Sequence, residues 1–214
     1  MLTEKQYSDL QRQLGQHSSW AVWAEPGSGN WKSKENIGDL EIFQSLGIQS
    51  VLNPNIVLLG LCRSREYEMP EFCAPSWINF HDGRSCSQDY KLRYALRNTI
   101  MWGAFLTDLN CTDIVQPAKN VQLTAEQCYA ELYDKLKRLP ATKSFRIIAL
   151  GCKTYSFLQK PEIRKKLQKD FFGCKVYKLT HYSMFLRLEQ YADEAMALNR
   201  ELLKDGYHFS RSSS

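Results

Sequence analysis

Short apolar segments and amphipathic segments alternate along most of the chain. Four segments are rich in apolar residues and have the length of strands, and the first is apolar throughout, which is typical of a strand buried on both faces. These are residues 56–61, 104–109, 145–150 and 174–179. A segment of helical periodicity follows each of them. This order predicts an α/β fold, a three-layer α/β/α arrangement with a four-stranded, mostly parallel central sheet.

End signals in the sequence mark the expected helices. Thr3 with Gln6, and Thr124 with Gln127, have the spacing of a capping box, in which each side chain bonds the backbone N–H of the other residue. We expect helices at residues 3–15, 90–102, 124–138 and 188–203, and a helix through the basic residues after Gly151 that Pro161 interrupts.

The first 50 residues follow a less regular pattern. Residues 20–31 combine three Trp residues with Pro and Gly, which is typical of irregular structure. Apolar residues at 37, 40, 43 and 46 predict a helix that ends at Gly47, and Asn-Pro-Asn at 53–55 predicts a turn. We expect one domain over residues 1–214, with an N-terminal helical and irregular extension at 1–50, a core at 55–205 and a disordered tail at 210–214.

The composition is that of a globular domain. The 214 residues are 43% hydrophobic and 24% charged, which excludes intrinsic disorder and low-complexity architectures. No apolar run approaches the roughly 20 residues of a membrane span, and the first residues lack the features of a secretory signal. We expect a monomeric, cytoplasmic protein with no membrane partner. Seven cysteines without a CxxC pair or zinc-ligand spacing predict reduced thiols and no metal site.

The net charge of +5 is unevenly distributed. Residues 143–178 contain ten basic and two acidic residues, so this segment carries +8 and the rest of the chain carries −3. A local basic excess favours a polyanionic partner, nucleic acid first. We therefore expect DNA as the partner, with the basic segment at the edge that faces it.

Ligands of parallel α/β sheets bind outside the carboxyl ends of the strands. This rule selects residues 62–65, 107–110, 151–153 and 181–185, which contain a thiol, an acid, a glycine turn and a histidine. No GxGxxG, GxxxxGK[ST] or GxSxG motif accompanies the strands. That absence argues against the usual dinucleotide fold, a P-loop and the serine hydrolases with a nucleophile elbow.

Three segments, in order, resemble motifs of the uracil-DNA glycosylase superfamily. Residues 58–64, Leu-Leu-Gly-Leu-Cys-Arg-Ser, are similar to its first motif, a strand that ends in glycine and a water-positioning Asp or Asn. Residues 75–80, Pro-Ser-Trp-Ile-Asn-Phe, resemble the segment that grips the DNA backbone, and residues 180–185, Thr-His-Tyr-Ser-Met-Phe, resemble the closing His-Pro-Ser motif. Cys62 replaces Asp or Asn and Tyr182 replaces Pro, and Asn-Phe-His at 79–81 resembles the signature of a divergent branch.

The resemblance implies an enzyme that flips a base out of DNA and hydrolyses its N-glycosidic bond without a cofactor, leaving an abasic site. It gives His181 the role of hydrogen-bonding the departing base, while Asp108 recognises the base edge or activates water. Cys62 lines the pocket, with water activated by Asp108, Asp82 or His81, or it acts as a nucleophile.

The other implied contacts divide into base-binding and DNA-binding groups. The base-binding residues are Asn79, Phe80, Phe72 and His81. The DNA-binding residues are Arg63, Ser64, Ser76, Lys153, Ser183, Met184 and Phe185. Of these, Met184 or Phe185, or the adjacent Leu186, fills the gap left by the flipped base.

The altered motifs favour a damaged or modified base, most simply a pyrimidine, over plain uracil. Excision then serves repair or defence against modified foreign DNA. Two other functions stay open. The first is an inactive nucleic-acid-binding module, which Cys62 in place of Asp or Asn supports. The second is a thiol-dependent hydrolase of a small nucleotide with Cys62 as nucleophile; the basic segment argues against it, because a free nucleotide does not need a charge of +8.

Overall fold

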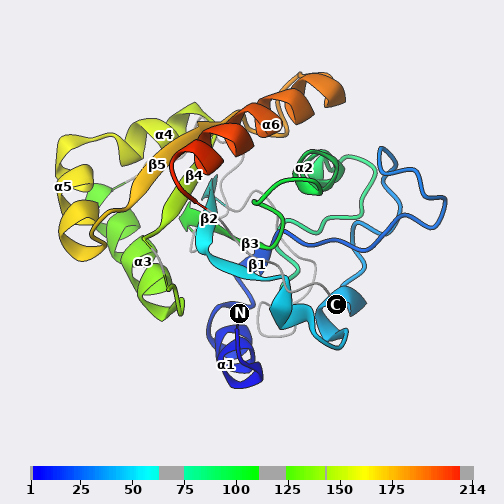
Figure 1. The fold of residues 1–214 in the computed structure, drawn as a ribbon, viewed down its shortest axis with the longest axis horizontal. Helices are drawn as coiled ribbons and strands as arrows, with labels where there is room; N and C mark the ends of the chain where they lie inside the picture. The colour runs from blue at the N-terminus through cyan, green and yellow to red at the C-terminus, as the bar shows by residue number, and fades with distance from the viewer. Residues whose placement is uncertain (1, 63–74, 111–123, 143, 208–214) are drawn as a thin grey trace.

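A five-stranded, mostly parallel sheet forms the centre of the molecule (Figure 1). The computed structural model describes residues 2–62, 75–110, 124–142 and 144–207. The strand order is β1-β3-β2-β4-β5; β2 to β5 run parallel, and β1 is antiparallel to β3. The strands are β1 (Ser18–Trp20), β2 (Asn53–Cys62), β3 (Ala104–Asn110), β4 (Arg146–Leu150) and β5 (Lys175–Leu179).

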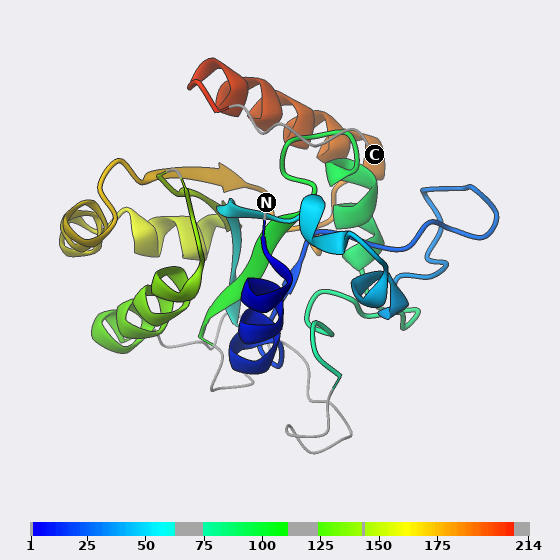
Figure 2. The ribbon, with the colours of Figure 1, turned by 60° about the horizontal axis from the view of Figure 1, so that its bottom comes forward.

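Helices cover both faces of this sheet, so the α/β class and the mostly parallel sheet are confirmed. One buried cluster joins α1, α3, α4 and α5 to one face, and a second joins α2 and α6 to the other. Figure 2 shows α3, α4 and α5 on one side of the strands and α2 with α6 on the other. The helices are α1 (Glu4–Leu14), α2 (Asp89–Leu96), α3 (Ala125–Arg138), α4 (Cys152–Leu158), α5 (Pro161–Asp170) and α6 (Leu188–Lys204).

The strand count differs from the predicted four because the N-terminal segment adds an edge strand. Ser18, Ser19 and Trp20 pair with Thr107, Leu106 and Phe105 of β3, and all three residues of β1 are buried. Three residues are too few to display a strand periodicity, so the sequence gives no signal for β1. The N-terminal segment also contributes buried side chains of α1 to the main core.

The turn predicted at residues 53–55 is wrong, because β2 begins at Asn53. The Asn53 side chain is fully buried, and its Oδ1 accepts a hydrogen bond from the Tyr207 hydroxyl at 2.8 Å. The same oxygen accepts the backbone N–H of Asn55 at 3.2 Å. The β2–β3 register shifts between Asn53 and Val57, so the Asn-Pro-Asn sequence marks an irregularity inside a strand.

The predicted helix ends are partly confirmed. The Thr3–Gln6 capping box forms with both reciprocal bonds. Thr124 instead bonds the Gln127 side chain and makes no backbone cap. Pro161 starts α5, which confirms the interruption after α4.

Two predicted helices are wrong in length or type. The helix expected at residues 37–46 is only the 3-10 turn Glu41–Gln44, followed by a second 3-10 turn at Ile48–Ser50. Leu46 is fully exposed, whereas Phe43 is buried against the core, so the apolar spacing there does not mark one continuous face. The helix α2 ends at Leu96, several residues before Trp102.

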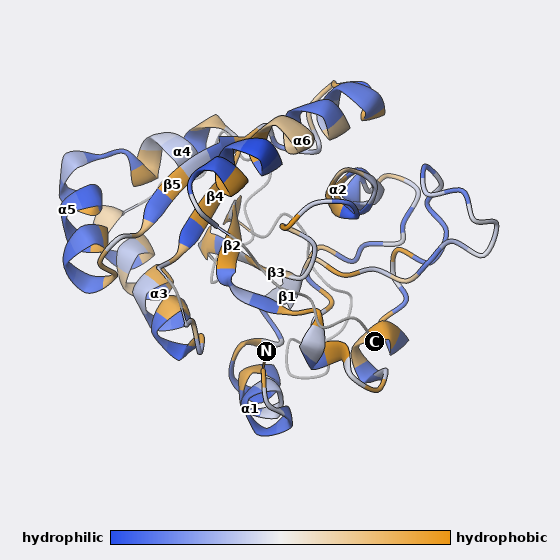
Figure 3. Cartoon of the chain, in the orientation of Figure 1, coloured by the Kyte–Doolittle hydropathy of each residue, from blue (hydrophilic) through white to orange (hydrophobic). Residues whose placement is uncertain are grey.

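The hydropathy of the residues follows this layered arrangement. Figure 3 shows hydrophobic colour on the central strands β2 and β4, and hydrophilic colour over much of α5. Along the described residues, no helix combines the length and the apolar character that crossing a membrane requires.

Candidate functional site

A cavity of about 700 Å³ lies at the carboxyl ends of the parallel strands. Its walls come from the ends of β2, β3, β4 and β5, from residues 79–89 and from residues 178–184. This volume is in the range of ligand sites in proteins. The cavity brings together eight residues of the predicted site, which are Cys62, Asn79, Phe80, Asp108, Lys153, His181, Ser183 and Met184.

Asp108 on β3 is held from two sides. The Asn79 side chain donates to Asp108 Oδ2 at 3.0 Å, and the ammonium of Lys135 on α3 donates to the Asp108 main-chain oxygen at 2.8 Å. Gly60 of β2 lies opposite Asp108 in the register. A Cβ atom at Gly60 would lie 2.0 Å from Asp108 Oδ1, so only glycine leaves room for this carboxylate position.

The segment that carries Asn79 and Phe80 has a strained backbone fixed by packing. Trp77 and Phe80 have φ values of 68° and 64°, which non-glycine residues seldom adopt. The buried Trp77 ring packs among aromatic rings of the core, and the backbone N–H of Trp77 donates to the Gly15 oxygen at 2.6 Å. The Trp23 indole donates to the Phe80 oxygen at 3.2 Å. Strain that the surroundings hold in place is typical of functional segments.

His181 follows β5 directly and lies against the glycine turn after β4. Its Cβ would lie 3.2 Å from a Cβ at Gly151, whose φ is +92°. The backbone N–H of Ser183 donates to His181 Nδ1 at 3.2 Å, so in the neutral ring the proton is on Nε2. Burial lowers the pKa of His181 to about 4, which keeps the ring neutral at pH 7. His181 is therefore a neutral N–H donor.

A second carboxyl group, Asp89 at the start of α2, also lines the cavity. Its Oδ2 accepts the Asp82 backbone N–H at 2.8 Å, and its side chain is hydrogen-bonded to Tyr182. Burial raises the pKa of Asp89 to about 6. The Tyr182 ring stacks on His181 at 4.5 Å, which links Asp89 to the histidine.

The sequence interpretation missed Asp89 as a site residue. An Asp before a helical segment predicts an N-terminal cap, and a cap role gives no reason to expect the residue in a cavity. In the structure Gln88 occupies the cap position and Asp89 is the first helical residue. Tyr182 was visible in the sequence as a departure from the His-Pro-Ser motif, but its contact with Asp89 was not.

Residues 181–186 contain two exposed apolar side chains, one of which lines the cavity. Met184 is half exposed and lines the cavity, and Phe185 is fully exposed. The Lys91 ammonium of α2 donates to the main-chain oxygens of Met184 and Leu186 at 3.3 and 3.2 Å, which anchors the segment. Leu186 packs against the core, so it does not present its side chain as Phe185 does.

Some predicted contacts lie elsewhere. His81 is almost fully buried, its ring nitrogens lie 2.9 Å from the Val22 oxygen and 3.0 Å from the Asn79 oxygen, and it does not line the cavity. The prediction that His81 contacts the base or activates water therefore disagrees with its position. Ser76 lies beside Gly15, also outside the cavity lining. Arg63, Ser64 and Phe72 lie outside the described residues.

Three cysteine side chains line the cavity, those of Cys62, Cys86 and Cys152. Among the five cysteines that the structure describes, none is in a disulfide. Within residues 2–62, 75–110, 124–142 and 144–207, no group of three or more His, Cys, Asp or Glu side chains is arranged to bind a metal ion.

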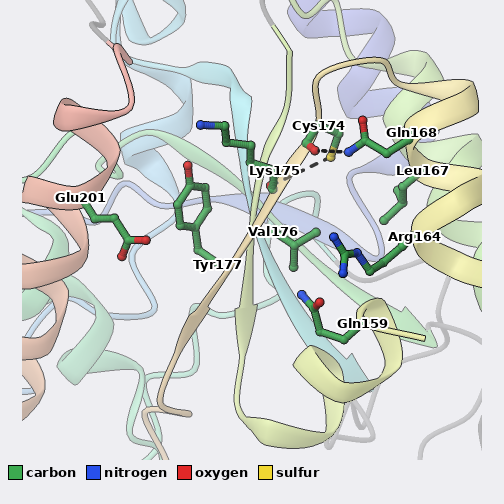
Figure 4. Close-up of a pocket in the computed structure, with 9 residues that line it drawn as sticks. All are labelled: Gln159, Arg164, Leu167, Gln168, Cys174, Lys175, Val176, Tyr177 and Glu201. Atoms are coloured by element: carbon green, nitrogen blue, oxygen red, sulfur yellow. Dashed lines mark hydrogen bonds between the residues drawn. The ribbon is translucent and has the colours of Figure 1, made fainter. Parts of the chain in front are cut away.

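The basic segment does not face the cavity as one surface. Of its described residues, Lys153 and Lys178 line the cavity. Arg164 and Lys175 instead line a second cavity of about 290 Å³, between α5 and α6 at the start of β5 (Figure 4). The basic residues are therefore divided between the cavity at the strand ends and other surfaces such as α5, and a DNA-facing basic edge stays a prediction.

The chain was compared with family models, with curated proteins and with solved structures, and none of them matches. The case for a function therefore comes from the side chains of the cavity.

Proposed function

We propose that the protein is a DNA glycosylase, which hydrolyses the N-glycosidic bond of a flipped-out damaged or modified base. One observation carries the proposal. A neutral N–H donor, His181, shares a cavity at the strand ends with two buried carboxyl groups, Asp108 and Asp89, and with the aromatic ring of Phe80. This combination matches the needs of glycosidic cleavage, in which negative charge develops on the base and positive charge on the sugar.

The first step is extrusion of the base from the DNA stack into the cavity. Extrusion costs a few kcal/mol of stacking and pairing. The exposed Phe185 and the half-exposed Met184 at the rim support this step, because apolar side chains can occupy the gap left in the stack. Inside the cavity, the edge-on pair of Phe80 and Tyr182, with ring centroids 6.4 Å apart, provides aromatic surface for the base.

The second step is cleavage of the bond between C1′ of the sugar and the base nitrogen. His181 Nε2–H donates to the base oxygen as the base takes up the bonding electron pair. A carboxylate of the cavity stabilises the positive sugar and accepts one proton from water, and the remaining hydroxyl bonds to C1′. The departing base is then protonated, and the products are a free base and an abasic site.

The DNA backbone is held by groups at the mouth of the cavity. Lys153 and Lys178 provide positive charge there, and the exposed hydroxyl of Ser183 offers a further hydrogen bond to phosphate. The exposed Lys178 side chain lies over the Tyr155 ring at 5.9 Å, which restricts its position.

The decisive experiment measures base release from single-stranded and duplex DNA that carries a panel of modified bases, with alkaline cleavage of the abasic sites. We expect strand breaks with the wild-type protein and at least a hundredfold slower release with His181→Ala. His17→Ala is the matched control, because the His17 main-chain oxygen that accepts from Asn79 stays in place.

Other outcomes of this experiment identify the alternative functions. Salt-sensitive DNA binding without release of any base contradicts the glycosylase and supports a binding module on the same fold. Hydrolysis of free nucleotides that Cys62→Ser and thiol alkylation abolish, with DNA left intact, supports the thiol-dependent hydrolase.

A further inference from the structure

The buried polar groups in the inner part of the cavity are mainly hydrogen-bond acceptors. Asp108 and Asp89 are only 4% and 5% exposed, and both line the cavity. An ionised carboxylate accepts hydrogen bonds and donates none, and it has room for about four donors. The polar lining therefore favours a ligand that brings donors of its own.

The environment of Asp108 keeps it in the acceptor role. The Asn79 amide nitrogen donates to Asp108 Oδ2, and the Lys135 ammonium lies 2.8 Å from the main-chain oxygen of the same residue. Both neighbours therefore place donors beside Asp108, on one side-chain oxygen and on the main-chain oxygen. Gly60 has no side chain, and a Cβ atom there would lie 2.0 Å from Asp108 Oδ1, so glycine leaves room for the carboxylate in this position.

The Tyr182 hydroxyl adds a further acceptor. Burial and the charges of Asp89 and Asp108 raise the pKa of Tyr182, so the hydroxyl keeps its proton, and it is hydrogen-bonded to Asp89. A hydroxyl whose proton is directed at a carboxylate offers its oxygen lone pairs to other groups. Tyr182 therefore reinforces the acceptor character that the two carboxyl groups give the cavity.

We propose that the cavity selects a pyrimidine with an exocyclic amino group, namely cytosine or a 5-substituted cytosine, and that Asp108 accepts a hydrogen bond from this amino group. The proposal rests on the proposed glycosylase function and names its substrate class. Cytosine presents an amino donor at the position where uracil and thymine present an oxygen acceptor. An oxygen facing Asp108 would be repelled, so the carboxylate both attracts the amino base and rejects the oxo base.

This proposal gives the two carboxyl groups different roles. Asp108 reads the base edge, and Asp89, which adjoins His181 through Tyr182, is left to stabilise the sugar and accept the proton of water. Asp108→Asn therefore changes which base is chosen, because an amide can donate where the carboxylate cannot.

The test uses two oligonucleotides that differ only in one base, 5-hydroxymethylcytosine or 5-hydroxymethyluracil at the same position. We expect wild-type kcat/KM to favour the amino base about 5- to 150-fold, the range of one good base-edge contact. In Asp108→Asn, the ratio of kcat/KM for the amino base to kcat/KM for the oxo base should fall at least tenfold. Asp193→Asn on α6 is the matched control, since Asp193 is exposed and lies outside the cavity lining, and its ratio should stay within twofold of wild type.

A second readout does not depend on catalysis. Free 5-hydroxymethylcytosine and free 5-hydroxymethyluracil are titrated into the ¹⁵N-labelled protein, and amide shifts of the cavity residues are followed by NMR. We expect the amino base to bind more tightly to wild type, and Asp108→Asn to lose that preference while it keeps the wild-type melting temperature. If no base is released from DNA but the free amino base binds more tightly, the proposed glycosylase function is contradicted and the proposed base selectivity is supported.

Two results overturn the selectivity. In the first, the wild type releases the oxo base as fast as the amino base or faster, and Asp108→Asn has the same ratio of release. This result would leave the proposed glycosylase function standing. The other is equal or undetectable binding of the two free bases to the wild-type cavity.

Discussion

Gly60 on β2 and Asp108 on β3 lie opposite each other, and a Cβ atom at Gly60 would be 2.0 Å from Asp108 Oδ1. No side chain fits there without moving the carboxylate or the strands. We predict that Gly60→Ala displaces the Asp108 side chain, slows base release at least tenfold and lowers the free energy of unfolding by about 1–3 kcal/mol, as overpacking in a core does. Single-turnover base release and urea unfolding measure the two effects.

Gly27→Ala is the control for this substitution. Gly27 is exposed, and the nearest neighbouring atom to its added Cβ is a Glu35 carboxylate oxygen at 3.8 Å, an ordinary contact. This variant should match the wild type in both measurements. A Gly60→Ala protein with normal base release would contradict the tight packing of Gly60 against Asp108.

Phe185 is a fully exposed aromatic residue that follows Met184, the last residue of the segment lining the cavity. We predict that Phe185→Ala slows base release from duplex DNA at least tenfold, because the gap left by the flipped base is no longer filled. Release from single-stranded DNA should change little, since no paired stack must be opened. The free energy of unfolding should stay within about 0.5 kcal/mol of the wild type, as for most surface substitutions.

Phe172 offers a matched comparison for Phe185. It is also an exposed phenylalanine, with 89% of its surface accessible, but it lies between α5 and β5, where neither of its chain neighbours lines the cavity. Phe172→Ala should leave both duplex and single-strand activity unchanged. Equal losses in the two variants would show that Phe185 acts only through general surface hydrophobicity.

Asp89 makes the stability of the protein depend on pH. Its pKa is about 6 in the folded protein because burial disfavours the charged form, against roughly 3.9 when unfolded. The unfolded chain therefore loses its proton first, and stability falls as pH rises from about 4 to above 6. We predict that Asp89→Asn, which has no charge to bury, gains about 1–3 kcal/mol relative to wild type between pH 4 and pH 8.

Urea unfolding of both proteins across this pH range measures the difference. Asp193→Asn on α6 is the control, because Asp193 is exposed and its substitution should leave the wild-type pH dependence unchanged. Parallel curves for wild type and Asp89→Asn would mean that Asp89 has an ordinary pKa in the folded protein.

His181 predicts the shape of the pH–rate profile. Burial lowers the pKa of His181 to about 4, so the neutral ring that donates through Nε2 is present at all pH values above this. We predict no transition of single-turnover kcat/KM near pH 6.5 that belongs to His181. Direct titration of the His181 ring by NMR checks the cause, and a ring that titrates near pH 6.5 would contradict it.

Lys153 and Lys178 are the residues of the basic segment that we expect to meet phosphates. Replacing both by Ala should reduce the slope of log K against log salt concentration by about 2 for duplex DNA, or about 1 for each phosphate contact. Lys165→Ala with Lys169→Ala on α5 removes the same charge from exposed positions outside the cavity lining and should leave the slope nearly unchanged. Equal changes in slope would mean that the whole segment contacts DNA.

Local sequence signals were sufficient to predict the strands and helices whose apolar residues recur regularly and are buried. The parallel strands β2 to β5 and most of the long helices lie close to their predicted bounds, because period and apolar content reflect burial on one or both faces. The strand ends also identified His181, Asp108 and Cys62 as neighbours, since parallel strands bring their carboxyl ends to one edge.

Only the tertiary structure decided features that depend on contacts between distant segments. The three residues of β1 become a strand because the free edge of β3 pairs with them. Asp89 becomes a site residue because α2 packs against α6 and brings the carboxyl to Tyr182, whereas its sequence neighbours suggest only a helix cap. His81 lies outside the cavity lining because its ring nitrogens are hydrogen-bonded to backbone oxygens in the interior.

The sequence by itself determined the α/β class and the edge of the sheet where chemistry is expected, since both follow from local periodicity and chain direction. The tertiary structure decided which polar groups lose water and which partners they find. Those two factors set the pKa of His181 and of Asp89, and neither depends on neighbours in sequence alone.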